Sequence, residues 1–158
     1  YIHTNQTMID MAKIITATSQ TTVRIAGEAN DCVIRAASNA TGIKYENIHV
    51  IAKKHGRKDG RGCDMKVLLK TYRDVGIHLS GVTGTTTYAD SAKFNAHQLM
   101  MDFKVYRGIT LERFLSIYNK GKYVCLIRGH AFAVISGKVV DSGALRAGTR
   151  ITAFFKVA

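Results

Sequence analysis

The spacing of apolar residues changes along the chain, and this change constrains the fold more than any other feature. In several segments up to residue 121, apolar side chains recur every three to four positions and a glycine follows, as in short amphipathic helices. From Lys122 the period falls to two in KYVCLIRGHAFAVI, and ITAFFKV follows near the end. Helices first and strands last predict an α+β fold, with N-terminal helices packed on a C-terminal antiparallel sheet.

Four helices are expected, at residues 32–42, 45–56, 65–74 (with Gly76 as its stop) and 110–121. The first 20 residues also carry a loosely helical apolar pattern that includes Ile14 and Ile15, and residues 22–25 have the composition of a short strand. No linker or internal repeat interrupts the chain, so residues 1–158 are expected to form a single domain. Residues 1–25 are a candidate N-terminal extension of that domain.

The composition and the net charge limit the cellular location and the kinds of partner that are expected for this chain. No window approaches 18 consecutive apolar residues, and the first 20 residues lack a signal-peptide pattern, so no membrane association is expected. Three widely spaced cysteines do not form a disulfide framework and favour a reducing, cytoplasmic location. The net charge of +12, from 23 basic and 11 acidic side chains, favours encounters with an anionic partner.

Cys32 lies in EANDCVIRAAS, where polar residues give way to a helix-prone run. Asn30 and Asp31 are preferred helix-capping residues, which places Cys32 in the first helical turn. There the free N–H groups and the helix dipole favour the thiolate and can supply part of an oxyanion hole. A buried structural cysteine is the alternative interpretation.

A second stretch, RGHAFAVISGKVVDS, is expected to form a β-hairpin. If the loop has two residues, Asp141 lies opposite Phe132 or Val134, on the face of His130 and within diagonal reach of it. The carboxylate of Asp141 could then accept the ring N–H of His130 and fix its orientation. A three-residue loop would turn Asp141 to the other face.

The remaining cysteines and histidines favour other roles. Cys125 is expected in the same strand as His130, five residues before it, and therefore on the opposite face and in the core. Cys63 lies in a basic, glycine-rich loop without a helix start, which makes it a weaker candidate nucleophile. No metal-ligand spacing or Gly-Lys-Ser/Thr phosphate loop occurs, so no metal and no cofactor are expected.

The segments NDCVIRAASNATG and GHAFAVISGKVVDS resemble a group of small papain-like proteins common in bacteriophage genomes. A cysteine that opens a helix, a later strand histidine and then an aspartate or asparagine is the chain order of papain-like cysteine peptidases. The context Cys-Val-Ile-Arg-Ala is also similar to that of the nucleophile in OTU-type deubiquitinases. The resemblance covers residues 30–56 and 111–142, about two-fifths of the chain.

This resemblance implies a thiol-dependent acyl-transfer enzyme, and a cysteine peptidase is the first expectation. The same catalytic groups also serve deubiquitinases and deamidases. Cys32 would be the nucleophile, His130 the general base and then acid, and Asp141 the orienting residue. Papain-like enzymes usually carry an oxyanion-hole glutamine six residues before the nucleophile, and this chain has Ala26 there. Asn30, Gln20 or backbone N–H groups alone are the alternatives. The expected substrate is a protein or peptide, and a phage-encoded chain would act in the host cytoplasm.

A non-catalytic binding protein is the second hypothesis. The loop KKHGRKDGRG and its surroundings gather basic side chains that could contact phosphates of a nucleic acid or an acidic host protein. They are Lys53, Lys54, Arg57, Lys58, Arg61 and Lys66. The loop contains no aromatic side chain for base stacking, which weakens a single-strand interpretation.

Overall fold

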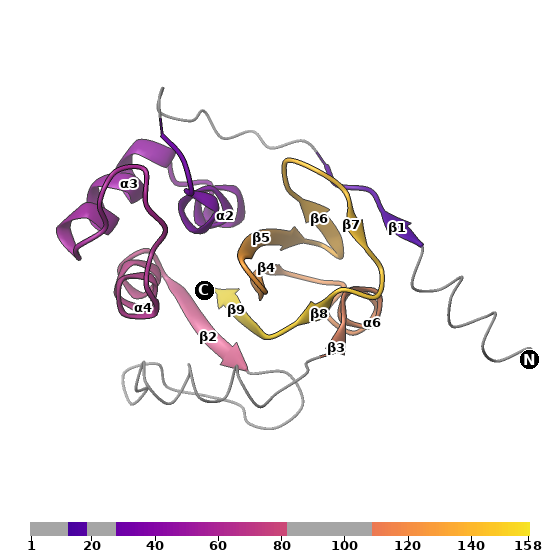
Figure 1. Ribbon diagram of the computed structural model, residues 1–158. Coiled ribbons are helices and arrows are strands. Elements are labelled where there is room, and N and C mark those ends of the chain that lie inside the picture. Colours follow the sequence, from indigo (N-terminus) through magenta and orange to yellow (C-terminus); the bar gives the residue numbers. More distant parts are fainter. Residues whose placement is uncertain (1–12, 19–27, 82–108) are drawn as a thin grey trace, which may run out of the picture.

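The computed structural model describes residues 13–18, 28–81 and 109–158, and its elements confirm the α+β class (Figure 1). The helices in these residues are α2 (Cys32–Thr41), α3 (Tyr45–Lys54), α4 (Met65–Asp74) and α6 (Leu111–Ile117). The strands are β1 (Ile14–Ile15), β2 (Ile77–Gly81), β3 (Ile109–Thr110), β4 (Lys122–Ile127), β5 (His130–Ile135), β6 (Lys138–Val140), β7 (Leu145–Arg146), β8 (Arg150–Ile151) and β9 (Ala153–Val157). None of these helices has the length and apolar character needed to cross a membrane.

The central sheet has five strands in the order β2-β9-β4-β5-β6, and each neighbouring pair is antiparallel. Helices α2, α3 and α4 gather on one side of it, and α6 packs on the other (Figure 1). Two shorter pairs, β1 with β7 and β3 with β8, complete the described β-structure. The sheet is therefore covered on both faces, with a separate hydrophobic cluster on each.

This two-sided burial explains why β4 is apolar at nearly every position. Val124 and Leu126 pack toward α2, α3 and α4, while Tyr123 and Cys125 pack toward α6. A strand buried on both faces loses the polar–apolar alternation of a half-exposed strand.

The hairpin of β5 and β6 has the two-residue loop that places Asp141 near His130. Val134 pairs with Val139 and Ile135 with Lys138, so Ser136 and Gly137 alone form the turn. Their φ angles of 50° and 75° suit the type I′ turns that match strand twist.

The run KYVCLIRGHAFAVI differs from the expectation of one strand. Gly129, with a φ of 73°, makes a turn after Arg128 and divides the run into β4 and β5. Cys125 therefore pairs with Phe132 and shares a sheet face with His130, so the expected opposite faces are wrong. Its assignment to the core is confirmed, because Cys125 is fully buried.

The N-terminal segment also departs from expectation. Ile14 and Ile15 form a strand and not a helix, because their backbone pairs with Leu145 and Arg146 of β7. Thr18 forms a parallel bridge with Val140, so residues 13–18 contact the described fold at both β7 and β6. The strand expected at residues 22–25 lies outside the described residues.

Candidate active site

Cys32 is the first residue of α2, as expected, and lies half-buried against the helix-side cluster. The apolar face of α2 packs on β5 and β4 and so brings the start of the helix beside the start of β5. Cys32 and His130 line the same pocket, and, against the effect of burial, the imidazole of His130 and the backbone N–H of Ala131 lower the pKa of the Cys32 thiol. The nucleophile and base suggested by the sequence therefore lie together.

His130 is also bound by Asp141, as the hairpin register predicts. The Nε2 atom of His130 lies 2.6 Å from Oδ2 of Asp141. Asp141 is held in turn, because its Oδ1 accepts the Ser142 N–H at 2.8 Å and its own N–H donates to the Thr18 carbonyl at 3.2 Å. The Asp141 side chain is 7% exposed and that of His130 27%, so the carboxylate is shielded while the ring still reaches the pocket.

The three groups favour a thiolate–imidazolium pair. Burial alone would raise the pKa of Cys32, but the hydrogen bonds from His130 and Ala131 and the charges of His130 and Arg35 outweigh it and lower that pKa. The hydrogen bond with Asp141, followed by that with Cys32, raises the pKa of His130 to about 9. The proton therefore favours the ring over the sulfur at neutral pH, which activates a cysteine nucleophile.

Cys63 lines the same pocket as Cys32, but its surroundings shift its pKa in the opposite direction. Burial raises the pKa of Cys63 to about 11, although the charge of Arg57 acts the other way. Its thiol is therefore protonated at neutral pH, and Cys32 is the better nucleophile of the two.

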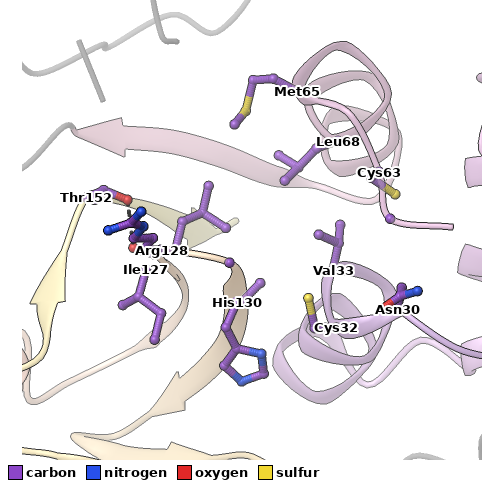
Figure 2. Close-up of a pocket in the computed structure, with 14 residues that line it drawn as sticks. Asn30, Cys32, Val33, Cys63, Met65, Leu68, Ile127, Arg128, His130 and Thr152 are labelled. Atoms are coloured by element: carbon purple, nitrogen blue, oxygen red, sulfur yellow. Dashed lines mark hydrogen bonds between the residues drawn. The ribbon is translucent and has the colours of Figure 1, made fainter. Parts of the chain in front are cut away.

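A pocket of about 920 Å³ opens beside Cys32 and His130, between the helices and β4 (Figure 2). Its wall is largely apolar, with Arg128 and Thr152 on the strand side. The apolar lining residues are Val33, Met65, Leu68, Leu126, Ile127 and Ala131. Figure 2 shows Cys32 on the helix side and His130 on the strand side of this space.

The two expected capping residues do not cap α2. Asp31 occupies the N-cap position but makes no side-chain capping bond. Asn30 lines the pocket, yet its Nδ2 donates to the Gly60 carbonyl at 2.9 Å, and in Figure 2 its amide points away from Cys32. The first-turn N–H groups of α2, which have no acceptor within a helix, are thus better placed than Asn30 to serve as an oxyanion hole. Gln20 lies outside the described residues.

A buried ion pair behind Asn30 was not expected from the sequence. Both guanidinium Nη atoms of Arg57 bind Glu28, at 3.1 and 3.2 Å, and the Glu28 carboxylate also accepts the Gly60 N–H and contacts His49. The side chain of Arg57 is 0% exposed and that of Glu28 is 3% exposed. The expected role of Arg57 as a surface contact is therefore wrong, because this guanidinium is buried and neutralised.

The other basic side chains remain on the surface. Lys54, Lys58, Arg61 and Lys66 are exposed, and Lys53 pairs with Asp59 at 3.3 Å. Glu28, His49 and Asp59 bring three metal-ligand atoms within 4.8 Å of one another. Arg57 already occupies the Glu28 carboxylate, however, and its charge disfavours a cation there.

The ion pair gives a stability prediction. Glu28→Gln leaves the Arg57 charge buried without its partner and is expected to lower the free energy of unfolding by about 3 kcal/mol in urea titrations at neutral pH. Because the hydrogen bonds from Arg57, against the effect of burial, hold the pKa of Glu28 well below 4.5, this contribution is present above pH 4.5 and is lost as the pH falls.

Glu112→Gln is the matched control, because Glu112 pairs with Lys13 at 2.7 Å while about half of each side chain is exposed. It is expected to cost less than about 1 kcal/mol. Equal losses in the two variants would contradict a structural role for the buried pair.

Comparisons with protein-family models, with curated proteins and with solved structures each gave no match. The chemistry of the described site is therefore the basis for inferring the function of the chain.

Proposed function

We propose that the chain is a thiol-dependent acyl-transfer enzyme, a cysteine peptidase-like hydrolase of papain-like organisation that acts on protein or peptide substrates. One arrangement carries the proposal: Cys32, at a helix start, shares a pocket with His130, which lowers the pKa of the thiol against the effect of burial and whose Nε2 lies 2.6 Å from Oδ2 of Asp141. Cysteine-dependent acyl transfer requires a nucleophile, a base and a carboxylate that orients the base, and these three residues supply them in that order.

Each group has a definite step. The Cys32 thiolate attacks the substrate carbonyl carbon, and the first-turn N–H groups of α2 stabilise the oxyanion that forms. The imidazolium of His130 gives its proton to the leaving amine, and the C–N bond breaks to leave an acyl-thioester. Neutral His130 then removes a proton from water, whose oxygen attacks the thioester and releases the acid and the thiolate.

The pocket supports a substrate with an apolar side chain near the scissile bond. Val33, Met65 and Leu68 on the helix side face Leu126 and Ile127 on the strand side. Burial of an aliphatic or aromatic side chain between them supplies binding free energy and positions the carbonyl at Cys32.

The test is alkylation by iodoacetamide at neutral pH, with the modified residue identified by mass spectrometry. We expect Cys32 to react faster than Cys63 by at least about tenfold, because only its pKa is lowered. His130→Ala should remove this preference, since the hydrogen bond and charge that stabilise the thiolate are lost.

His55→Ala is the matched control, because His55 forms a similar 2.6 Å contact with Asp74 and neither residue lines the pocket of Cys32 and Cys63. It should leave the labelling unchanged. Preferential labelling of Cys63, or equal labelling of Cys32 with and without His130, would overturn the proposed function.

A further inference from the structure

Three of the described helices, α2, α4 and α6, are preceded by an N-cap residue whose side chain can cap a helix. Only in α2 does that side chain make no capping hydrogen bond. Asp64 accepts the Val67 N–H at 2.8 Å and caps α4, and Thr110 accepts the Arg113 N–H at 3.3 Å and caps α6. Asp31, in the same position before α2, makes no such bond. Aspartate is among the best N-cap residues, so something must hold this carboxylate elsewhere.

Tyr45 and Arg35 hold it. The Tyr45 hydroxyl donates to Oδ2 of Asp31 at 2.7 Å, and the Nε atom of Arg35 lies 3.0 Å from Oδ1. Asp31 is 1% exposed and Tyr45 2% exposed, so neither partner is exchanged for water. The backbone agrees, because Asp31 has a ψ of 19° where the capping Asp64 has 168°.

We propose that Tyr45 and Arg35 are positioning residues of the acyl-transfer site: they withdraw the Asp31 carboxylate from the first turn of α2, so that the N–H groups there stay free for the substrate oxyanion. This inference rests on the proposed function. A carboxylate in the capping position would occupy those donors and would repel both the Cys32 thiolate and the developing oxyanion.

The experiment compares two reactions of Cys32 in Tyr45→Phe, which loses one hydroxyl and keeps the ring. Acylation by p-nitrophenyl acetate passes through an oxyanion, whereas alkylation by iodoacetamide requires only the thiolate. We expect the ratio of the acylation rate to the alkylation rate to fall about tenfold or more. Adding Asp31→Ala to Tyr45→Phe removes the released carboxylate and should restore the wild-type ratio, which mere destabilisation would not do.

A second pair of variants decides the question if Tyr45→Phe unfolds in a thermal melt. Asp31→Ser offers a short hydroxyl that can cap the turn and should lower the ratio, while Asp31→Ala should not. An unchanged ratio in Tyr45→Phe or Asp31→Ser, or no restoration by Asp31→Ala, overturns the positioning role of Tyr45 and Arg35 but not the proposed function. A wild-type Cys32 that reacts no faster than Cys63 with either reagent overturns the proposed function as well.

Discussion

Cys32→Ser is expected to reduce turnover of p-nitrophenyl acetate on the order of 10³-fold or more, as losses of other catalytic nucleophiles do. The site favours a thiolate whose proton already resides on His130, with that ring's pKa raised to about 9. A serine hydroxyl does not ionise at neutral pH, and a protonated imidazole cannot remove its proton. The reaction therefore loses its nucleophile although one atom is all that changes. Release of p-nitrophenolate in a stopped-flow instrument measures the effect.

Cys63→Ser provides the control within the same pocket. The pKa of Cys63 is about 11, so its thiol contributes little nucleophile at neutral pH and the variant should retain the wild-type rate. A large loss in Cys63→Ser together with a small loss in Cys32→Ser would assign the chemistry to the wrong cysteine and reject the mechanism.

The features that the sequence could predict depend on local rules. A helical period and a following glycine located α2, and Gly42 does adopt a left-handed φ of 77° after it. The turn residues Ser136 and Gly137 determined the hairpin loop, and hairpin parity then placed Asp141 within reach of His130. Each of these inferences needs only residues that are near in sequence or paired across one turn.

The features that were missed depend on contacts between distant segments. Asp31 meets Tyr45 14 positions later, and Glu28 meets Arg57 29 positions later. No local pattern distinguishes Arg57, which is buried, from the exposed Lys58 beside it. The strand at Ile14 and Ile15 likewise exists because β7, far along the chain, supplies its partner.

These long-range contacts link the fold to the chemistry. Thr18 accepts the N–H of Asp141 and donates its own N–H to the Val139 carbonyl, so the N-terminal segment fixes the end of β6. The buried ion pair of Glu28 and Arg57 holds the segment of chain that immediately precedes Cys32. The nucleophile and the orienting carboxylate are thus each anchored by a segment remote in sequence, while the base comes from the central sheet.

Asp141 variants are expected to change both the rate and its pH dependence. In the wild type, activity should decline above about pH 9, where His130 loses the proton that it gives to the leaving group. Asp141→Asn can still accept the ring N–H but lacks the charge, so the pKa of His130 falls and the alkaline limb moves to lower pH. Asp141→Ala also loses the orientation of the ring, and we expect a rate decrease on the order of 10²-fold or more. The rates are measured on peptide amides that carry an apolar side chain near the scissile bond.

The contact of His55 with Asp74 supplies the matched control for this titration, because Nε2 and Oδ2 are 2.6 Å apart there as well. Asp74→Asn removes the same charge from a more exposed carboxylate and should leave the alkaline limb of the profile in place. An alkaline limb that stays near pH 9 in Asp141→Asn would mean that the carboxylate does not set the protonation of His130. The proposed division of roles requires the limb to move in Asp141→Asn and to remain fixed in Asp74→Asn, because Asp141 contacts the ring that shares the pocket with Cys32, whereas Asp74 contacts His55.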